Sequence, residues 1–311
     1  IRLFPNNMKI RYNLGKAYAK KQIDHKALEE FEKVVNLDSS FYDVYIDRAE
    51  LFLKLGDRQE AIESYEKSCS IKPDAKILLK LAKIFESEGE KARANIYYKK
   101  ASELEPDNAE AYYKIGLDYE VSGNFEQAIN NYKKAVGIDA NYIEAHIHLG
   151  HLYFSNEQWA DSINEYMTCV EAEKGDFQIY YNLAFSYQKL NSLDEACAFY
   201  LEAQRFDSDN IDILRNLGAI YDSKHMTDDA LFIYEKVLDK DPGDWKVAIN
   251  LGKIYMDRGD VERAVSKYNI ALAGDPENVD LYLELARAYV GIKKYKEALE
   301  YIKKGMALYE Q

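Results

Sequence analysis

Three histidines lie close together in the segment HIHLGH and could take part in metal binding. His148 and His151 are three residues apart, so a helix would place both imidazoles on one face, where they could hold a metal ion. His146 falls on the packing face, and the neighbouring sequence supplies no third ligand. We therefore interpret His148 and His151 as polar groups lining a binding surface, and we predict no metal and no other cofactor.

Motifs for catalysis are missing from the sequence. It contains no glycine-rich nucleotide loop, no GxSxG elbow and no HExxH helix. The carboxylates stand beside lysines, as in EEFEK at 29–33, a spacing typical of solvated helix surfaces. Cys69, Cys169 and Cys197 share no CxxC spacing, which favours small buried residues in a reducing compartment. We predict no catalytic residues, no enzymatic activity and an intracellular, cytoplasmic location.

Composition and charge exclude further classes of protein. Of 311 residues, 47% are apolar and 31% are charged, a balance typical of folded proteins. The net charge is −13, whereas a nucleic-acid partner requires a basic surface. No segment approaches the apolar length needed to span a membrane. We therefore expect neither nucleic acid nor a membrane as a partner.

A small residue recurs every 34 residues, with a single interval of 33, and a second small residue follows each one by twelve positions. Calling the first position 8 and the second position 20, we expect two antiparallel helices to approach most closely there, because a larger side chain would overpack the contact. The residues at position 8 are Gly15, Ala49, Ala82, Gly116, Gly150, Ala184, Gly218, Gly252 and Ala286. Those at position 20 are Ala27, Ala61, Ala94, Ala128, Ser162, Ala196, Ala230, Ala264 and Ala298.

Aromatic residues and turn residues follow the same register. Position 11 is Tyr or Phe in every repeat, and position 24 is aromatic in all but the last, where it is Ile302. Four glycines occupy position 15, where a left-handed residue would end the first helix: Gly56, Gly89, Gly123 and Gly259. The five prolines all fall between one hairpin and the next. The sequence therefore predicts an all-α protein of nine helical hairpins.

This pattern resembles the tetratricopeptide (TPR) repeat over residues 8–311, with departures such as Ser162 and Lys174 in the fifth repeat. The resemblance implies a right-handed α-solenoid of nine antiparallel helix hairpins, whose first helices line a concave groove. A single array is expected, with repeats starting near 8, 42, 75, 109, 143, 177, 211, 245 and 279. Residues 1–7 read as the tail of a preceding repeat, so we expect a fragment of a longer protein.

The resemblance places positions 2, 5, 6, 9, 12 and 13 of each repeat in the groove. Apolar side chains that the core does not require gather there, and we predict that they bind a partner together with His148 and His151. They are Tyr113, Leu117, Ile147, Phe154, Tyr181 and Phe185. Packing between adjacent first helices is the alternative. Toward the N-terminus, an acidic segment could bind a row of lysines, namely Lys16, Lys20, Lys54, Lys76, Lys80 and Lys83.

Asparagine occupies position 6 in three successive repeats, as Asn182, Asn216 and Asn250, and also in the first repeat, as Asn13. An amide there could donate and accept hydrogen bonds with the backbone of an extended peptide. The row resembles the asparagine ladder of TPR arrays such as that of O-linked N-acetylglucosamine transferase. Its alternative is a residue that is simply frequent in TPR sequences. No repeat combines the Lys and Asn of TPR domains that hold chaperone C-termini.

These observations predict a non-enzymatic scaffold that binds an extended segment of a protein or peptide partner in its groove. Two alternatives stay open. The array could be the substrate-recruiting arm of a larger enzyme such as a glycosyltransferase, or a structural subunit of a multiprotein assembly. Association into a homodimer through the terminal repeats is a further alternative.

Overall fold

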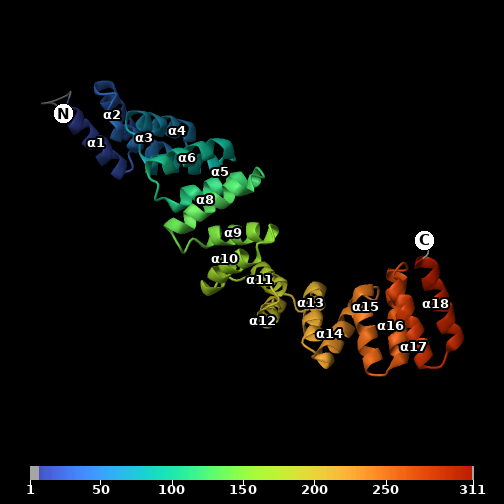
Figure 1. Ribbon diagram of the computed structural model, residues 1–311. Coiled ribbons are helices and arrows are strands. Elements are labelled where there is room, and N and C mark those ends of the chain that lie inside the picture. Colours follow the sequence, from blue (N-terminus) through green and yellow to red (C-terminus); the bar gives the residue numbers. More distant parts are fainter. Residues whose placement is uncertain (1–6, 310–311) are drawn as a thin grey trace. The chain divides into compact units, whose positions relative to one another are not determined.

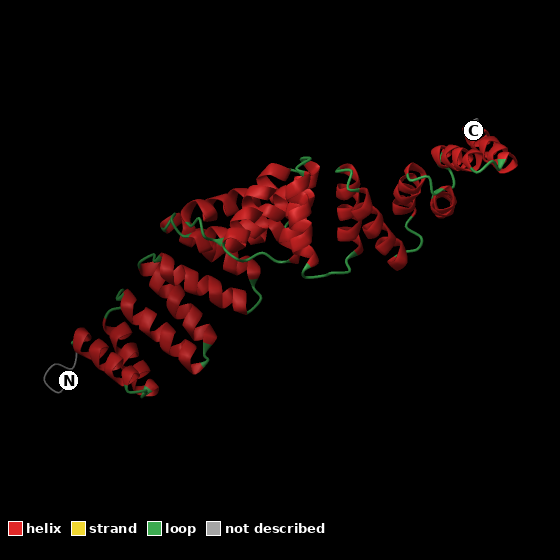
Figure 2. Ribbon diagram, turned by 90° about the horizontal axis from the view of Figure 1, so that it is seen from below, coloured by secondary structure: helices red, strands yellow, loops and turns green. Residues whose placement is uncertain are grey.

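A computed structural model describes residues 7–309, in which helices alternate with short loops and no strand occurs (Figure 2). The all-α repeat architecture predicted from the sequence is therefore confirmed. The segment 1–7 was expected to end a preceding repeat. All of it except Asn7 lies outside the described residues.

The odd-numbered helices are the first helices of the hairpins. They are α1 Met8–Lys20, α3 Tyr42–Leu55, α5 Ala75–Ser87, α7 Ala109–Val121, α9 Ile143–Ser155, α11 Phe177–Lys189, α13 Ile211–Ser223, α15 Trp245–Asp257 and α17 Val279–Gly291. The even-numbered helices are the second helices. They are α2 Asp24–Leu37, α4 Arg58–Ile71, α6 Lys91–Leu104, α8 Phe125–Ile138, α10 Trp159–Glu171, α12 Leu193–Gln204, α14 Thr227–Lys240, α16 Val261–Gly274 and α18 Tyr295–Tyr309.

The chain forms two compact units, residues 1–152 and residues 153–311. Within the first unit, α1–α2, α3–α4, α5–α6 and α7–α8 pair as hairpins, and α2, α4 and α6 each contact the first helix of the next hairpin (Figure 1). Within the second unit, α11–α12, α13–α14, α15–α16 and α17–α18 do the same (Figure 1). The core of each unit is therefore a row of similar contacts between sequence neighbours, as in other repeat proteins.

Position 8 is small because an aromatic ring from the second helix covers it. A Cβ atom added to Gly252 would lie 2.4 Å from the ring of Tyr268, and one added to Gly116 would lie 2.6 Å from the ring of Tyr132. Both tyrosines are fully buried. The close approach predicted between positions 8 and 20 thus also depends on the ring at position 24.

Position 15 adopts the left-handed conformation in every repeat. The four glycines predicted to end first helices in this way have φ between 75° and 91°, which confirms that prediction. Five other residues have φ between 57° and 61° at the same position, namely Gln22, Glu157, Asn191, His225 and Lys293. The hairpin geometry therefore imposes this conformation even on residues with a Cβ atom, for which it is unfavourable.

Candidate functional site: the inner faces of the two units

We use the term inner face for the surface of each unit formed by positions 2, 5, 6, 9, 12 and 13 of its first helices, together with the side chains that lie beside them. The residues proposed from the sequence to bind a partner fall into both units. Tyr113, Leu117, Ile147, His148 and His151 belong to the first unit. Phe154, Tyr181, Asn182, Phe185, Asn216 and Asn250 belong to the second. Each unit is described by itself.

In the first unit, Tyr113 and His148 belong to an aromatic cluster. The ring of Tyr113 lies 5.1 Å from that of Tyr142, and the ring of His148 stacks 5.2 Å from that of Tyr132. Glu120 joins the cluster, because its Oε2 accepts a hydrogen bond of 2.5 Å from the Tyr132 hydroxyl and lies 2.8 Å from His148 Nδ1. Burial, followed by this bond, raises the pKa of Tyr132 well above its usual range. His148 is therefore held in place by its neighbours.

The other two histidines differ in burial. His146 is 8% exposed, and its Nε2 lies 3.1 Å from the carbonyl oxygen of Ala140, in agreement with its predicted place on the packing face. His151 and Ile147 are half-buried. Within residues 7–309, no three His, Cys, Asp or Glu side chains gather in a way that could hold a metal ion.

Leu117 lines a hollow of about 200 Å³ on the inner face of the first unit. Beside it Val121 is 78% exposed, an unusual position for a large apolar side chain. The rim is polar, and Glu86 there accepts hydrogen bonds from Lys114 and Tyr98. Burial would raise the pKa of Glu86, but these two bonds lower it below its usual value. The hollow thus combines an apolar floor with fixed charges.

The N-terminal lysines are mostly engaged with carboxylates, which neutralises the row expected to attract an acidic segment. Each of these pairs joins one repeat to the next or to the preceding one. The pairs are Lys16–Asp47 at 3.8 Å, Lys54–Asp24 at 2.9 Å, Lys80–Glu50 at 2.6 Å and Lys83–Glu110 at 2.9 Å. Pairs of this kind that remain exposed to water contribute little to stability.

The second unit carries a larger group of half-buried aromatic rings. Phe154, Trp159 and Phe185 form a triangle with ring centroids 5.4–5.7 Å apart. Phe177, Tyr181 and Phe185 continue as a row along α11, with near-parallel rings at 6.0 Å and 6.5 Å. Sequence reasoning overlooked Trp159 and Phe177. The four-residue spacing of the aromatics in FQIYYNLAF was the signal that could have identified Phe177.

The asparagines at position 6 bind tyrosine hydroxyls of the preceding hairpin. Asn182 is 4% exposed, and its Nδ2 donates to the Tyr166 hydroxyl at 2.8 Å while its Oδ1 accepts from Gln178 Nε2 at 2.8 Å. Asn250 Nδ2 donates to the Tyr234 hydroxyl at 3.1 Å. Burial raises the pKa of Tyr200 beyond its usual range, against the opposing effect of a hydrogen bond with Asn216. These amides therefore form hydrogen bonds with the hydroxyls of buried tyrosines, and the Tyr200 hydroxyl also donates to Gln188 Oε1 at 2.9 Å.

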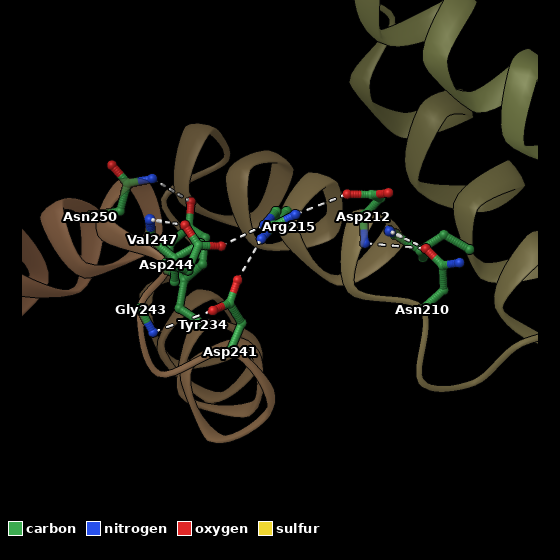
Figure 3. Close-up of polar contacts among 10 residues, drawn as sticks. Asn210, Asp212, Arg215, Tyr234, Asp241, Gly243, Asp244, Val247 and Asn250 are labelled. Atoms are coloured by element: carbon green, nitrogen blue, oxygen red, sulfur yellow. Dashed lines mark hydrogen bonds and ion pairs between the residues drawn. The ribbon is translucent and has the colours of Figure 1, made fainter. Parts of the chain in front are cut away.

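Arg215 connects two hairpins of the second unit through three carboxylates (Figure 3). Its Nε donates to Asp244 at 2.5 Å, its Nη2 to Asp241 at 3.0 Å and its Nη1 to Asp212 at 3.0 Å. Asp244 is only 7% exposed and also caps α15 by accepting from the Val247 amide. One guanidinium thus balances three carboxylates, which leaves a local excess of negative charge. Position 5 is apolar or aromatic in the other repeats, so Arg215 stands out in the sequence, whereas its partners do not.

Together, the hairpins and their register define a helical repeat solenoid. Models of the tetratricopeptide repeat match residues 9–41, 42–74, 75–108 and 177–210, and a model of the TPR repeat matches residues 121–157. A model of the anaphase-promoting complex, cyclosome, subunit 3, matches residues 223–305. The chain belongs to the tetratricopeptide repeat family.

Solved structures share this fold at low sequence identity. YrrB, described as a TPR protein with an unusual peptide-binding site, is 21% identical, and the match covers 59% of this chain and 95% of YrrB with a TM-score of 0.52. MamA AMB-1, in its P212121 crystal form, is 21% identical over 55% of this chain and 94% of its own, with a TM-score of 0.51. No curated protein sequence matches the chain. Among the described residues, no helix is long and apolar enough to cross a membrane.

Proposed function

We propose that this chain is a non-enzymatic interaction scaffold that binds an extended segment of a protein partner along its inner face. The observation that carries the proposal is the row of half-buried rings Phe177, Tyr181 and Phe185, in which Phe177 and Tyr181 pack against the core on one side and keep part of their surface exposed. Aromatic side chains of this kind supply much of the energy of protein interfaces. Peptide binding by YrrB, a protein of the same fold, agrees with this use of the surface.

Each unit has its own proposed binding surface, and the residues of these surfaces differ in their accessibility. In the first unit it includes Tyr113, Leu117, Ile147, His148 and His151, together with Val121. In the second unit it includes Phe154, Tyr181, Phe185, Asn216 and Asn250, together with Trp159 and Phe177. Asn182 has a supporting role in this proposal, because both ends of its amide are already hydrogen-bonded inside the protein.

A structural subunit of a larger assembly is the second candidate. Two observations favour it. The C-terminal residues 223–305 match the model of an anaphase-promoting complex subunit. Second helices also expose large apolar side chains, including Ile96 on α6 and Phe232 on α14, which is 66% exposed. Apolar side chains exposed on second helices could bind neighbouring subunits.

Matched variants distinguish these functions. One alters the inner face, and the other alters the outer face, by which we mean the exposed surface of the second helices. The inner-face variant carries Val121→Asp and Tyr181→Ala, and the outer-face variant carries Ile96→Asp and Phe232→Ala. Each is used to recover bound proteins from its own cells, with helical content and thermal unfolding checked by circular dichroism. We expect partners to be lost by the inner-face variant and kept by the outer-face variant. Loss confined to the outer-face variant would contradict inner-face binding and favour the assembly subunit.

A further inference from the structure

The aromatic row on α11 ends in a cation. Phe177, Tyr181, Phe185 and Lys189 follow one another at intervals of four residues, so they share one face of the helix. The ammonium group of Lys189 lies 5.1 Å from the centre of the Phe185 ring, within the range of a cation–π interaction. The exposed end of this row therefore already accommodates a positively charged side chain.

Negative charge is concentrated in the same part of the chain. Residues 153–250 contain 19 Asp and Glu but only 8 Lys and Arg, so they account for −11 of the total charge of −13. Residues 1–100 contain 20 Lys and Arg against 16 Asp and Glu, and residues 101–152 contain 3 against 9, so residues 1–152 carry a net charge of only −2. Such an uneven distribution attracts oppositely charged partners to one region and speeds their association.

Two carboxylates that bind Arg215 are open to solvent, and one of them, Asp212, lies near Tyr181 of the row. Asp212 precedes Arg215 on α13, and its side chain is 65% exposed. It is also close enough to Tyr181 for its charge, after burial, to raise the pKa of that hydroxyl. Asp241 is 42% exposed on the other side of the guanidinium (Figure 3). Because Arg215 is shared among three carboxylates, its single charge leaves these oxygens able to bind a further cation.

We infer that the inner face of the second unit binds an extended basic segment of a partner, with one Lys or Arg side chain on the rings of Tyr181 and Phe185 and another at Asp212 and Asp241. The inference rests on the proposed scaffold function and adds the chemistry of the partner. The partner's cation takes the position over Phe185 that Lys189 occupies in the free protein. Aromatic rings favour a cation on their faces, and the nearby carboxylates strengthen that preference.

The first unit provides a contrast within the same chain. There the lysines of the inner face are paired with carboxylates of adjacent repeats, and the exposed hollow is lined by Leu117 and Val121. Over the whole first unit there are 23 Lys and Arg against 25 Asp and Glu, a net charge of −2, so it has no comparable preference for a basic partner. The selectivity for Lys and Arg is therefore assigned to the second unit alone.

The first test uses a display library of random 12-residue peptides, selected on the purified 311-residue chain. We expect the enriched peptides to contain at least two Lys or Arg and to be lost when the selection is repeated on the Tyr181→Leu, Phe185→Leu variant. Enriched peptides that depend on the two rings but show no excess of Lys or Arg would overturn the inference and leave the scaffold function standing. Enriched peptides unaffected by the rings and by Val121→Asp would argue against both.

The second test measures affinities by fluorescence anisotropy with one selected peptide and its copy in which Gln replaces every Lys and Arg. Phe185→Leu keeps an apolar side chain but removes the ring, and it should weaken binding roughly five- to tenfold. Phe232→Leu is the matched control on an outer helix and should change nothing. Asp212→Asn should also weaken binding, whereas Asp239→Asn on α14 should not.

Lys189→Gln gives the sharpest prediction, because it removes the internal competitor for the rings. It should tighten binding of the basic peptide severalfold, and it should leave the Gln-substituted peptide unaffected. Lys174→Gln removes the same charge from an exposed loop and serves as its control. Equal effects of Lys189→Gln and Lys174→Gln, or equal effects of Phe185→Leu and Phe232→Leu, would show that only the overall charge matters and would overturn the site.

Discussion

The side-chain amide of Asn182 donates a hydrogen bond to the buried hydroxyl of Tyr166, which lies on the second helix of the preceding hairpin. The same relationship joins Asn250 to Tyr234. These asparagines at position 6 therefore stabilise the contact between hairpins, and their amide groups are already hydrogen-bonded before any partner binds. This contact accounts for asparagine at Asn182 and Asn250 without reference to a ligand.

Replacement of this amide should lower stability. Asn182→Ala leaves the Tyr166 hydroxyl without its donor in a buried site, so we expect a loss of about 1–3 kcal/mol in the free energy of unfolding. Urea denaturation followed by circular dichroism measures it, with Asn164→Ala at an exposed position of α10 as the control. Adding Tyr166→Phe should recover part of the loss. A loss in Asn182→Ala no greater than in Asn164→Ala would contradict this account of the asparagine row.

The ring over Gly252 makes that position sensitive to a single methyl group. Gly252→Ala would place its Cβ 2.4 Å from Tyr268, and relief of this overlap should cost about 1–3 kcal/mol of stability. Gly137→Ala is the opposite case, since no atom lies within 4 Å of the added Cβ on α8. It should be neutral or stabilise by up to about 1 kcal/mol, because alanine favours helix. Equal thermal shifts for the two variants would refute this packing.

The left-handed residues at position 15 predict a stabilising substitution. His225 has φ of 58°, a conformation that costs a residue with a Cβ atom about 1–2 kcal/mol. His225→Gly removes that strain and adds a smaller entropic cost, so we expect a net gain of about 0.5–1 kcal/mol. Gly123→Ala should lose a similar amount at the equivalent turn, where φ is 75°. Thermal unfolding of both variants checks the opposite signs.

The reactivity of the Cys169 thiol can be used to measure local unfolding in the second unit. Burial, then the charge of Glu165, raises the pKa of its thiol to about 12, and the residue is fully buried. Only the thiolate reacts, so at pH 8 a thiol reagent should modify Cys169 roughly a thousandfold more slowly than an unfolded cysteine. A variant with Cys69→Ser and Cys197→Ser isolates this signal. Rapid labelling of the folded variant would show that the hairpin around Cys169 opens readily.

The fold could be predicted because its determinants recur at fixed spacing. Gly116 and Tyr132 occupy the same positions as their counterparts in other repeats, and a helix-forming sequence with this period has few other ways to pack. The inner face was harder to predict. Arg215 stands out in the sequence as an unusual residue. Its partners Asp241 and Asp244 lie in the loop between α14 and α15, and only the folding of the chain brings them next to Arg215.

Two details of the candidate site depend on choices that the sequence leaves open. The amide of Asn182 could point toward solvent or into the protein, and its hydrogen bond to the buried hydroxyl of Tyr166 directs it inward. Trp159 begins a second helix, and its ring packs against Phe154 and Phe185. Side-chain direction at helix ends depends on the neighbouring hairpin, and periodicity alone does not contain that information.

The contacts between successive helices also determine how the chain can fold. Inside each unit, the helix pairs with extensive contact are neighbours or near neighbours in sequence, so most loops to be closed are no longer than about one repeat. Short loops carry a small closure entropy, and chains rich in local contacts fold fast. Folding can begin in any hairpin and spread outward, and its speed should change little as hairpins are added at an end.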